Sequence, residues 1–600
     1  MAQAATAERA EVLARPLTGN EAIARGVWEA GVRVAAAYPG TPSTEILENI
    51  AKYPKEDIAA QWATNEKVSL DVAIGAALSG VRAFAAMKHV GLNVASDSLM
   101  SQTYIGVHAG LVLAVCDDPG IHSSQNEQDT RLMAQFANVP VLEPSDAQEA
   151  LEFTRLAFDL SEGFDTPVIV RSTTRLSHTR STVLVGDRAE PESRGFGGDP
   201  EKTVSIPSVA RARHPLVIER EAKLSAYFET SPLTRWEKGD TRVGIITHGT
   251  VYPYVKEVAS GFSILKLAGS YPLPANTIRD FAASVDRVIV VEELEPVIEN
   301  SVKALGVAAE GKRFFSRVGE LSSELVRAGL AEAGIVEAPR SVETLDIRPV
   351  ARPPVLCSGC PHTASYMALR AVDAQVAGDI GCYTLAAVEP LRSIDTTVCM
   401  GASIANAVGM ALAKTSDKPI VATIGDSTFL HSGIPPLIDA VYNNADITVV
   451  ILDNRITAMT GGQDHPGTGR TLRGDETHKV VYEDICRAVG VTDIRRVDPY
   501  EVAGLYKAMR EAVERKGVSV VIVERPCVLD PVKIKGTPLE VKEENCVACQ
   551  SCMNLGCPSI TWSDTYYEGH HKVQIDTTSC IGCSLCAQLC PSDAIRPVLS

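Results

Sequence analysis

Hydrophobic and polar residues follow one another along the chain in blocks that predict helices and strands in turn. Residues 19–31 space their apolar side chains as an amphipathic helix does, and residues 32–40 predict a short strand that ends in a turn. Residues 68–80 predict a helix of small side chains, followed by strands in the apolar runs at 81–87 and 111–118. Strands that alternate with helices indicate a parallel sheet.

The same alternation returns in two later stretches, which makes the fold class α/β with several domains. Residues 181–238 lose the periodicity and gain Arg, Pro and Gly, which predicts a linker with one helix. A second α/β stretch runs from 243 to about 335, and a third begins after the Pro-rich segment 348–355. The third stretch predicts a helix at 433–443 and strands at 420–426, 446–454 and 518–526.

Length and charge narrow the possible functions. The 600 residues correspond to about four domains, and 45% apolar with 22% charged residues is ordinary for a globular protein. The net charge is −17 and no basic stripe interrupts it, which excludes a generic nucleic-acid surface. The N-terminal residues lack an apolar signal region, and the longest apolar runs are far shorter than the roughly 18 residues of a membrane span. We expect a cytoplasmic protein with no nucleic-acid or membrane partner.

The 15 cysteines are unevenly distributed along the chain. Cys116 is the only one before Cys357, whereas eight lie in the last 55 residues. A secreted protein would place disulfides along its whole length, so this distribution indicates metal chemistry in a reducing compartment.

Two cysteine runs in the tail have the spacing of iron–sulfur ligands. Each is C-x2-C-x2-C followed by a Cys-Pro pair, the pattern of bacterial two-cluster ferredoxins, although the first run has four residues instead of three before its last cysteine. In that pattern the last cysteine of each run binds the other cluster. Zinc also binds C-x2-C pairs, but it has no use for the third spaced cysteine. The sequence therefore predicts two 4Fe–4S clusters, one on Cys546, Cys549, Cys552 and Cys590, the other on Cys580, Cys583, Cys586 and Cys557.

A candidate cation site lies where two strands of the third stretch end. Gly425, Asp426 and Ser427 end one strand, and Asp453 with Asn454 ends the next, so both groups reach the carboxyl edge of a parallel sheet. A carboxylate and an amide oxygen suit Mg2+ with substrate phosphates. These residues resemble the thiamine-diphosphate motif GDG…NN, with Ser427 for its last Gly and Asp453 for its first Asn. A simple strand-end turn is the alternative.

Further strings give the chain a family resemblance. They are residues 19–26, 38–46, 65–80, 87–97, 122–131 and 357–362, followed by the ferredoxin tail. In this order they are similar to the large, iron–sulfur subunit of the indolepyruvate ferredoxin oxidoreductases, which are thiamine-diphosphate-dependent 2-oxoacid:ferredoxin oxidoreductases. The resemblance covers nearly the whole chain, and 181–238 matches least.

The resemblance implies a domain order for the α/β chain. Residues 1–180 would form the pyrimidine-binding domain of a thiamine-diphosphate enzyme and 181–238 a linker. A transketolase-C-terminal-like domain would span 239–340, the diphosphate-binding domain 341–535, and an α+β ferredoxin domain with two clusters 536–600.

The resemblance also implies roles for two residues in the first domain. Glu66 would hydrogen-bond N1′ of the thiamine aminopyrimidine, and Thr41 would lie near the substrate carbonyl. From the residues alone, Glu66 also fits a solvated helix start, and Thr41 an N-cap, for which Ser43 competes. His89, His122 and His362 lie in the family strings, and His122 or His89 could face the substrate. A structural role is the commoner one for a histidine in a turn.

In the diphosphate-binding domain the resemblance implies a bound Mg2+ and a third cluster. The Mg2+ ligands would be Asp426, Asn454 and the Ile456 carbonyl, with two diphosphate oxygens. A Gly-rich loop at 457–463 has backbone N–H groups that suit a diphosphate. Further cofactor contacts would come from Gly425, Ser427, Gly461 and Gly462.

The third 4Fe–4S cluster would lie near the thiamine ring, because stepwise oxidation needs an electron acceptor within tunnelling range. A zinc site on the same residues, or unligated buried thiols, are the alternatives. Cys116, Cys399 and Cys486 have no partners at ligand spacing and are expected in the core. The four ligands would be Cys357, Cys360, Cys382 and Cys527.

The reaction implied is the conversion of an arylpyruvate and CoA to aryl-acetyl-CoA and CO2, with electrons leaving to ferredoxin. A small β subunit would complete the enzyme as a heterotetramer of two large and two small subunits. The alternatives are a non-oxidative thiamine-dependent decarboxylase, which releases no electrons, and an electron-transfer subunit whose α/β part is scaffold.

Overall fold

The computed structural model describes residues 13–338, 350, 353–530 and 536–598. The chain forms two compact units, Met1–Leu345 and Asp346–Ser600. The predicted boundary between residues 340 and 341 lies outside the described residues, and so does the residue before the predicted tail boundary at 536.

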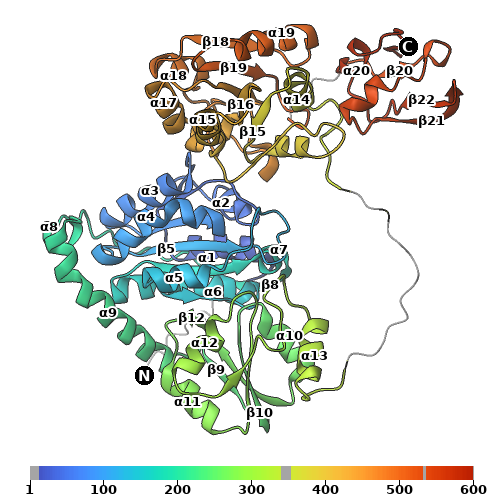
Figure 1. Cartoon of the computed structure of the whole chain (residues 1–600). Helices are drawn as coiled ribbons and strands as arrows, with labels where there is room; N and C mark the ends of the chain where they lie inside the picture. The colour runs from blue at the N-terminus through green and yellow to red at the C-terminus, as the bar shows by residue number, and fades with distance from the viewer. Residues whose placement is uncertain (1–12, 339–349, 351–352, 531–535, 599–600) are drawn as a thin grey trace, which may run out of the picture. The chain divides into compact units, whose positions relative to one another are not determined.

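The first unit is built on a seven-stranded sheet with the order β12-β6-β7-β5-β4-β2-β3 (Figure 1). All neighbouring strands run parallel except β12, which is antiparallel to β6. Every residue of β4 and β5 is buried, as their uninterrupted apolar runs predict for a sheet covered on both faces. The strands are β2 (Val34–Ala37), β3 (Ala59–Trp62), β4 (Ala83–Lys88), β5 (Leu111–Asp117), β6 (Val141–Leu142), β7 (Val168–Thr173) and β12 (Gly269–Tyr271).

Helices cover both faces of this sheet (Figure 1). On one face, α3 (Glu66–Leu78), α4 (His89–Ile105) and α5 (Thr130–Ala137) share a core with alternate residues of β4 and β5. Elsewhere α1 (Gly19–Glu29) packs against α6 (Ala147–Phe164), which contacts β5 and β7. The prediction of a parallel α/β sheet is confirmed.

A second sheet follows in the same unit, with the order β14-β13-β10-β11-β9. Within 181–238, where the sequence predicts a linker with one helix, the chain instead forms most of β8, a single turn α8 (Pro200–Thr203) and the long helix α9 (Pro207–Thr230). Strand β8 (Arg180–Val185) pairs with β1 (Leu13–Thr18). The strands of the second sheet are β9 (Arg235–Glu237), β10 (Asp240–His248), β11 (Phe262–Leu267), β13 (Val288–Val291) and β14 (Ala309–Glu310).

The second unit contains a five-stranded parallel sheet with the order β15-β16-β17-β19-β18. The predicted strands at 420–426, 446–454 and 518–526 are β16, β17 and β19, and the helix predicted at 433–443 is α17 (Ile434–Tyr442). The strands are β15 (Gln375–Ala377), β16 (Ile420–Gly425), β17 (Thr448–Asp453), β18 (Asp493–Val497) and β19 (Ser519–Glu524), and the main helices around them are α14 (His362–Ala371), α15 (Ser403–Ala413), α18 (Tyr482–Ala488) and α19 (Val502–Val513).

The cysteine-rich tail packs into the core of this second unit. Leu356, Leu505 and Val523 of the sheet domain share one hydrophobic cluster with Leu539 and Leu585 of the tail. The tail consists of two antiparallel strand pairs, β20 (Leu539–Val541) with β23 (Ile595–Pro597) and β21 (Ile560–Tyr567) with β22 (His570–Ile575), and one short helix, α20 (Leu585–Gln588).

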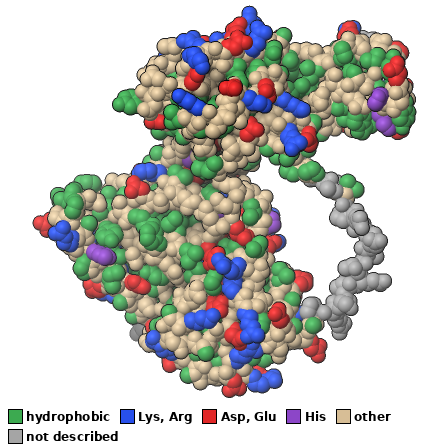
Figure 2. All heavy atoms as spheres, in the orientation of Figure 1, with side chains coloured by type: hydrophobic (Ala, Val, Ile, Leu, Met, Phe, Trp, Pro, Cys, Tyr) green, Lys and Arg blue, Asp and Glu red, His purple; other side chains and the backbone are tan. Residues whose placement is uncertain are grey.

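Basic and acidic side chains lie intermixed on the face of the molecule drawn in Figure 2. Among the described residues, no helix combines the length and the apolar character that crossing a membrane requires.

Candidate functional site

Glu66 lies at the start of α3, in the first unit. Asn65 caps this helix by accepting the Val68 N–H at 2.9 Å, which fixes the backbone of Glu66. The Glu66 side chain is 6% exposed and packs against Gly91 of α4, where an added Cβ would lie 2.6 Å from Glu66 Cγ and Oε1. Glu66 is therefore a buried carboxyl group held in a narrow space, and the solvated helix start that the sequence also allowed is wrong.

The carboxyl edge of the seven-stranded sheet brings four of the family strings together. The Lys88 ammonium donates to the carbonyl of Ser123 at 3.1 Å, and the Ser123 hydroxyl donates to the carbonyl of Thr41 at 3.2 Å. Glu66 is close enough to Lys88 for its charge to act on the lysine pKa. Thr41 is half-buried and does not cap α2 (Thr44–Ile50), because Ser43 is the N-cap residue.

Sequence reasoning did not single out Lys88. The signal was present in the sequence, since a lysine directly follows the apolar run predicted as a strand at 81–87. What the pattern could not give was the burial of its side chain, which is 8% exposed.

Of the two candidate histidines in the first unit, His89 is buried and His122 is exposed. His89 is buried, and its Nε2 lies 3.3 Å from the carbonyl of Asn126. The side chain of His122 is 49% exposed, with Nε2 3.7 Å from a carboxylate oxygen of Glu320. Neither contact points to a ligand.

In the second unit, the three predicted Mg2+ ligands converge. The Asn454 amide oxygen lies 2.7 Å from the Ile456 carbonyl oxygen and 3.3 Å from Asp426 Oδ2, while the amide nitrogen lies 3.3 Å from His362 Nε2. Rotating the amide would place its NH2 group on the two oxygens. With either orientation of the amide, the Asn454 side chain, the Ile456 carbonyl and the Asp426 carboxylate lie together, and such oxygen donors suit a hard cation. The donor set therefore fits Mg2+.

Buried polar groups surround these oxygens. His465 Nε2 lies 3.3 Å from Asp426 Oδ2, and its Nδ1 accepts the Gly467 N–H at 3.1 Å. Burial lowers the pKa of His362 to about 4, so the ring is neutral beside Asn454. Burial and the neighbouring Asp426 raise the pKa of Asp453 to about 7. None of the partners His362, His465 and Asp453 was predicted as a ligand.

The glycines of this region shape the backbone. Gly425 donates its N–H to the Tyr383 hydroxyl at 3.0 Å, and a Cβ at Gly425 would lie 2.8 Å from the Tyr383 ring. Gly461 and Gly462 have φ of 121° and 94°, which favour glycine. Their N–H groups donate to Ala458 and Thr457 within the loop. Both N–H groups thus help to close the 457–463 turn, and the contact of this loop with a diphosphate stays a prediction. Ser427, which follows Asp426, donates its N–H to the Asp426 carboxylate at 2.8 Å.

The four cysteines predicted for a third cluster lie close to one another. Burial raises the pKa of Cys360, and the thiols of Cys357, Cys382 and Cys527 act in the same direction, as neighbouring acidic groups do. The same cysteines lie beside Asp426, Asn454 and the Ile456 carbonyl, which we call the oxygen cluster, because the Cys527 N–H donates to the Asn454 carbonyl at 2.9 Å. We call the four cysteines the cysteine quartet.

The tail cysteines gather in the two predicted sets. Cys546, Cys549, Cys552 and Cys590 line one cavity together with Val541 and Ile595. Burial raises the pKa of Cys586 to about 12, with contributions from Cys583, Cys557 and Cys580. Cys557, Cys583 and Cys586 also line a cavity that Cys357 of the quartet reaches. The second tail set therefore lies next to the quartet.

Within the described residues, no three or more His, Cys, Asp or Glu side chains are arranged to bind a metal ion. The cysteine ligands of an iron–sulfur cube lie further apart than the ligands of a single ion, so the cysteine sets need not meet this geometry. Cys116 and Cys486 are buried, as expected, whereas Cys399 is exposed and the expectation of a core position is wrong.

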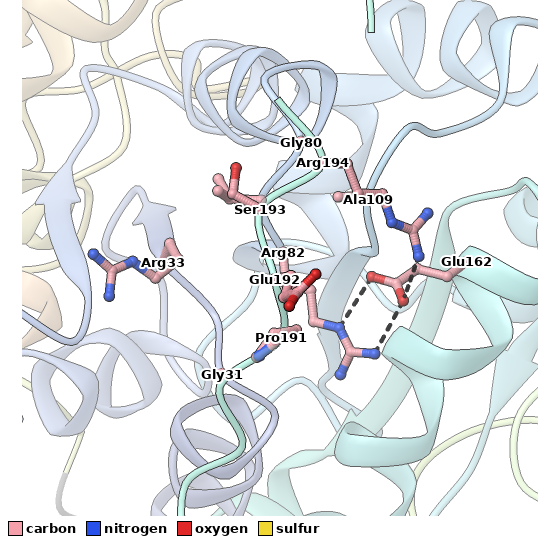
Figure 3. Close-up of a pocket in the computed structure, with 11 residues that line it drawn as sticks. Gly31, Arg33, Gly80, Arg82, Ala109, Glu162, Pro191, Glu192, Ser193 and Arg194 are labelled. Atoms are coloured by element: carbon pink, nitrogen blue, oxygen red, sulfur yellow. Dashed lines mark hydrogen bonds and ion pairs between the residues drawn. The ribbon is translucent and has the colours of Figure 1, made fainter. Parts of the chain in front are cut away.

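A pocket of about 390 Å³ lies at the opposite edge of the first unit's sheet, lined by Arg33, Arg82, Glu162 and Arg194 among others (Figure 3). Both Arg82 and Arg194 form ion pairs with Glu162. Arg82 also pairs with Asp159, so the two guanidinium groups face two carboxylates, and none of the predicted site residues lines the pocket.

Three family models match the chain. Residues 25–232 match pyruvate flavodoxin/ferredoxin oxidoreductase, thiamine diP-bdg. Residues 379–523 match the C-terminal TPP binding domain of thiamine pyrophosphate enzymes, and residues 573–596 match a 4Fe-4S binding domain. The matches cover the Glu66 region, the oxygen cluster and the second tail run respectively.

Whole-chain relatives agree with these models. Indolepyruvate oxidoreductase subunit IorA of Archaeoglobus fulgidus is 43% identical over 97% of this chain and 97% of its own. The same subunit of Thermococcus kodakarensis is 42% identical over 97% of both. A solved 2-oxoglutarate:ferredoxin oxidoreductase from Magnetococcus marinus is 18% identical, covers 54% of this chain and 65% of its own, and has a TM-score of 0.45.

Proposed function

Since the chain belongs to the indolepyruvate oxidoreductase subunit IorA family of thiamine-diphosphate-dependent 2-oxoacid:ferredoxin oxidoreductases, we propose that it oxidatively decarboxylates arylpyruvates with CoA. The products are an aryl-acetyl-CoA and CO2. The two electrons released leave one at a time through iron–sulfur clusters to ferredoxin.

One observation carries this proposal, namely that the oxygen cluster and the cysteine quartet adjoin. The Cys527 N–H donates to Asn454, whose side chain faces Asp426 and the Ile456 carbonyl. An oxidative decarboxylase needs an electron acceptor beside the cofactor that this site would hold by its diphosphate. A non-oxidative decarboxylase does not need one.

Several of the predicted site residues would hold the cofactor. Thiamine diphosphate, when bound, supplies the carbon chemistry of decarboxylation. Asp426, Asn454 and the Ile456 carbonyl would hold Mg2+ on its diphosphate, a role that their three converging oxygens support. Glu66 would hold a proton at N1′ of its aminopyrimidine, and its burial against Gly91 keeps the carboxyl group from turning into water. Thr41 would face the substrate carbonyl.

Twelve cysteines would hold three 4Fe–4S clusters, in the order quartet, second tail set, first tail set. The shared cavity of Cys357 with Cys557 and Cys583 supports this order. Ferredoxin would accept electrons from the tail. A small β subunit would complete the enzyme, with two copies of each subunit.

An anaerobic assay of the complex with the small subunit tests this function. Arylpyruvate, CoA and a low-potential dye are mixed with the enzyme, and dye reduction, CoA thioester and aldehyde are measured. We expect CoA-dependent dye reduction, which Glu66→Gln lowers by at least about 100-fold while the iron content is unchanged. Aldehyde release without dye reduction would indicate the non-oxidative decarboxylase. No consumption of arylpyruvate would indicate an electron-transfer subunit only.

A further inference from the structure

Lys88 is an exception among the buried cationic side chains. Among the described residues, five Lys or Arg residues are less than 9% exposed, counted over the whole residue. Four of them pair with carboxylates within the chain: Arg131 with Asp129, Arg171 with Asp117, Arg220 with Asp165, and Lys266 with Glu149. No carboxylate of the described residues lies within 4.0 Å of the Lys88 ammonium, whose hydrogen bond goes to the Ser123 carbonyl.

The two carboxylates whose charges act on Lys88, those of Asp118 and Glu66, make their closest contacts with other groups. Asp118 accepts the Ser123 N–H at 2.8 Å and the hydroxyls of Ser124 and Thr174, both at 2.7 Å. Glu66 packs against Gly91. A buried ammonium with no carboxylate at ion-pair distance is unfavourable by several kcal/mol, so an anion bound beside Lys88 would be stabilising.

The position of Lys88 defines what that anion can be. The lysine ends β4 at the carboxyl edge of the sheet, where ligands bind in such folds. Its stem lies against Gly40, where an added Cβ would be 3.2 Å from Lys88 Cδ. Gly40 precedes Thr41, and Thr41 and Lys88 are both hydrogen-bonded to Ser123. The ammonium is thus placed beside the residues proposed for the substrate carbonyl and for the cofactor.

We propose that Lys88 binds the carboxylate of the 2-oxo acid substrate, an inference that rests on the proposed function. A desolvated ammonium and a carboxylate form a strong charge-assisted hydrogen bond. The site would therefore select an acid over a neutral ketone or aldehyde. Because the carboxylate leaves as neutral CO2, the same interaction does not retain the product.

Binding of inert analogues tests the proposal directly. The probes are an aryl-lactate, which keeps the carboxylate but cannot be decarboxylated, and its primary amide. Their dissociation constants are measured by calorimetry on the anaerobic complex. The wild-type enzyme is expected to bind the acid about 10- to 100-fold more tightly than the amide. Lys88→Met is expected to abolish this preference by weakening the acid alone, and Lys88→Arg to keep most of it.

Lys52→Met is the matched control, because Lys52 is exposed in the same unit and hydrogen-bonds Asn49. It removes one positive charge and should leave both affinities unchanged. Equal affinity of the wild-type enzyme for acid and amide would overturn the proposal without the use of any variant. An equal loss for both probes in Lys88→Met would overturn it too, since it would indicate a structural lysine.

The dye assay on the same preparation separates the two hypotheses. If the wild-type enzyme reduces dye but Lys88→Met binds the acid normally, the role of Lys88 is refuted and the proposed function stands. If the wild-type enzyme consumes no arylpyruvate while the acid binds through Lys88, the proposed function is refuted and a carboxylate site remains.

Discussion

The hydroxyl of Tyr500 donates a hydrogen bond to the carbonyl of Gly359, which lies between Cys357 and Cys360. The carbonyl of Tyr500 accepts the side-chain amide of Gln588 at 2.7 Å, and Gln588 lies between Cys586 and Cys590. One residue thus connects the loop of the quartet to the tail helix α20, which carries Cys586 of the second set and is followed by Cys590 of the first.

Tyr500→Phe is expected to slow electron transfer from the quartet to the tail by up to about tenfold, the equivalent of one lost hydrogen bond. The loop around Gly359 would lose one of its hydrogen-bonded links to the tail, while the contact between the Ser358 and Ser559 hydroxyls at 2.7 Å remains. Rapid-freeze EPR after mixing with arylpyruvate and CoA measures the rate at which the tail clusters are reduced. Tyr506→Phe, at an exposed position of α19, is the control. Equal rates in wild type and Tyr500→Phe would refute the connection.

Gly91→Ala is expected to lower turnover at least about tenfold. The added Cβ would lie 2.6 Å from Glu66 Cγ and Oε1, so the carboxyl group must shift. Steady-state dye reduction measures the loss, and iron content should stay unchanged.

Gly75→Ala is the matched control on the helix of Glu66. No atom lies within 4 Å of a Cβ added there, and alanine favours a helix over glycine by about 1 kcal/mol. This variant should keep full activity and melt slightly higher. A Gly91→Ala enzyme as active as Gly75→Ala would contradict the position assigned to Glu66.

Cys360→Ser is expected to lower the iron content from about twelve to about eight per chain, because one cube of three is lost. Cys486→Ser, at a buried cysteine of α18 without a ligand role, should keep about twelve. Iron and sulfide are counted on anaerobically purified protein. About eight irons in the wild-type enzyme, or zinc that is lost only from Cys360→Ser, would refute a cluster at the quartet.

Lys312 gives a pH dependence of stability. Burial lowers the pKa of Lys312 to about 8, although the Glu292 carboxylate acts to raise it. The unfolded chain keeps this proton up to about pH 10.4, so between about pH 8 and 10.4 the unfolded state binds more protons and stability rises with pH. Relative to Lys312→Met, the wild-type enzyme should gain about 1 kcal/mol from pH 8 to pH 9, measured by denaturant unfolding. A constant difference would contradict the lowered pKa.

The strands of the sheets were predictable because their apolar residues form nearly uninterrupted runs, as in β16 and β17. Helix α9 was not fully predictable, because its buried stripe includes Arg220, which binds Asp165 and breaks the apolar pattern. Among site residues, Asp426 and Asn454 follow from strand ends alone. The role of Lys88 depends on the lack of an ion-pair partner, and only the folded chain reveals which side chains surround it.

In the proposed reaction, electrons from the substrate leave through the chain's own cysteine-bound clusters. EPR of the anaerobic complex, frozen after mixing with arylpyruvate and CoA in the absence of any dye, reports the oxidation state of these clusters. We expect reduced-cluster signals that require both substrates and appear in proportion to the CO2 released. Release of CO2 with every cluster still oxidised would refute this route for the electrons.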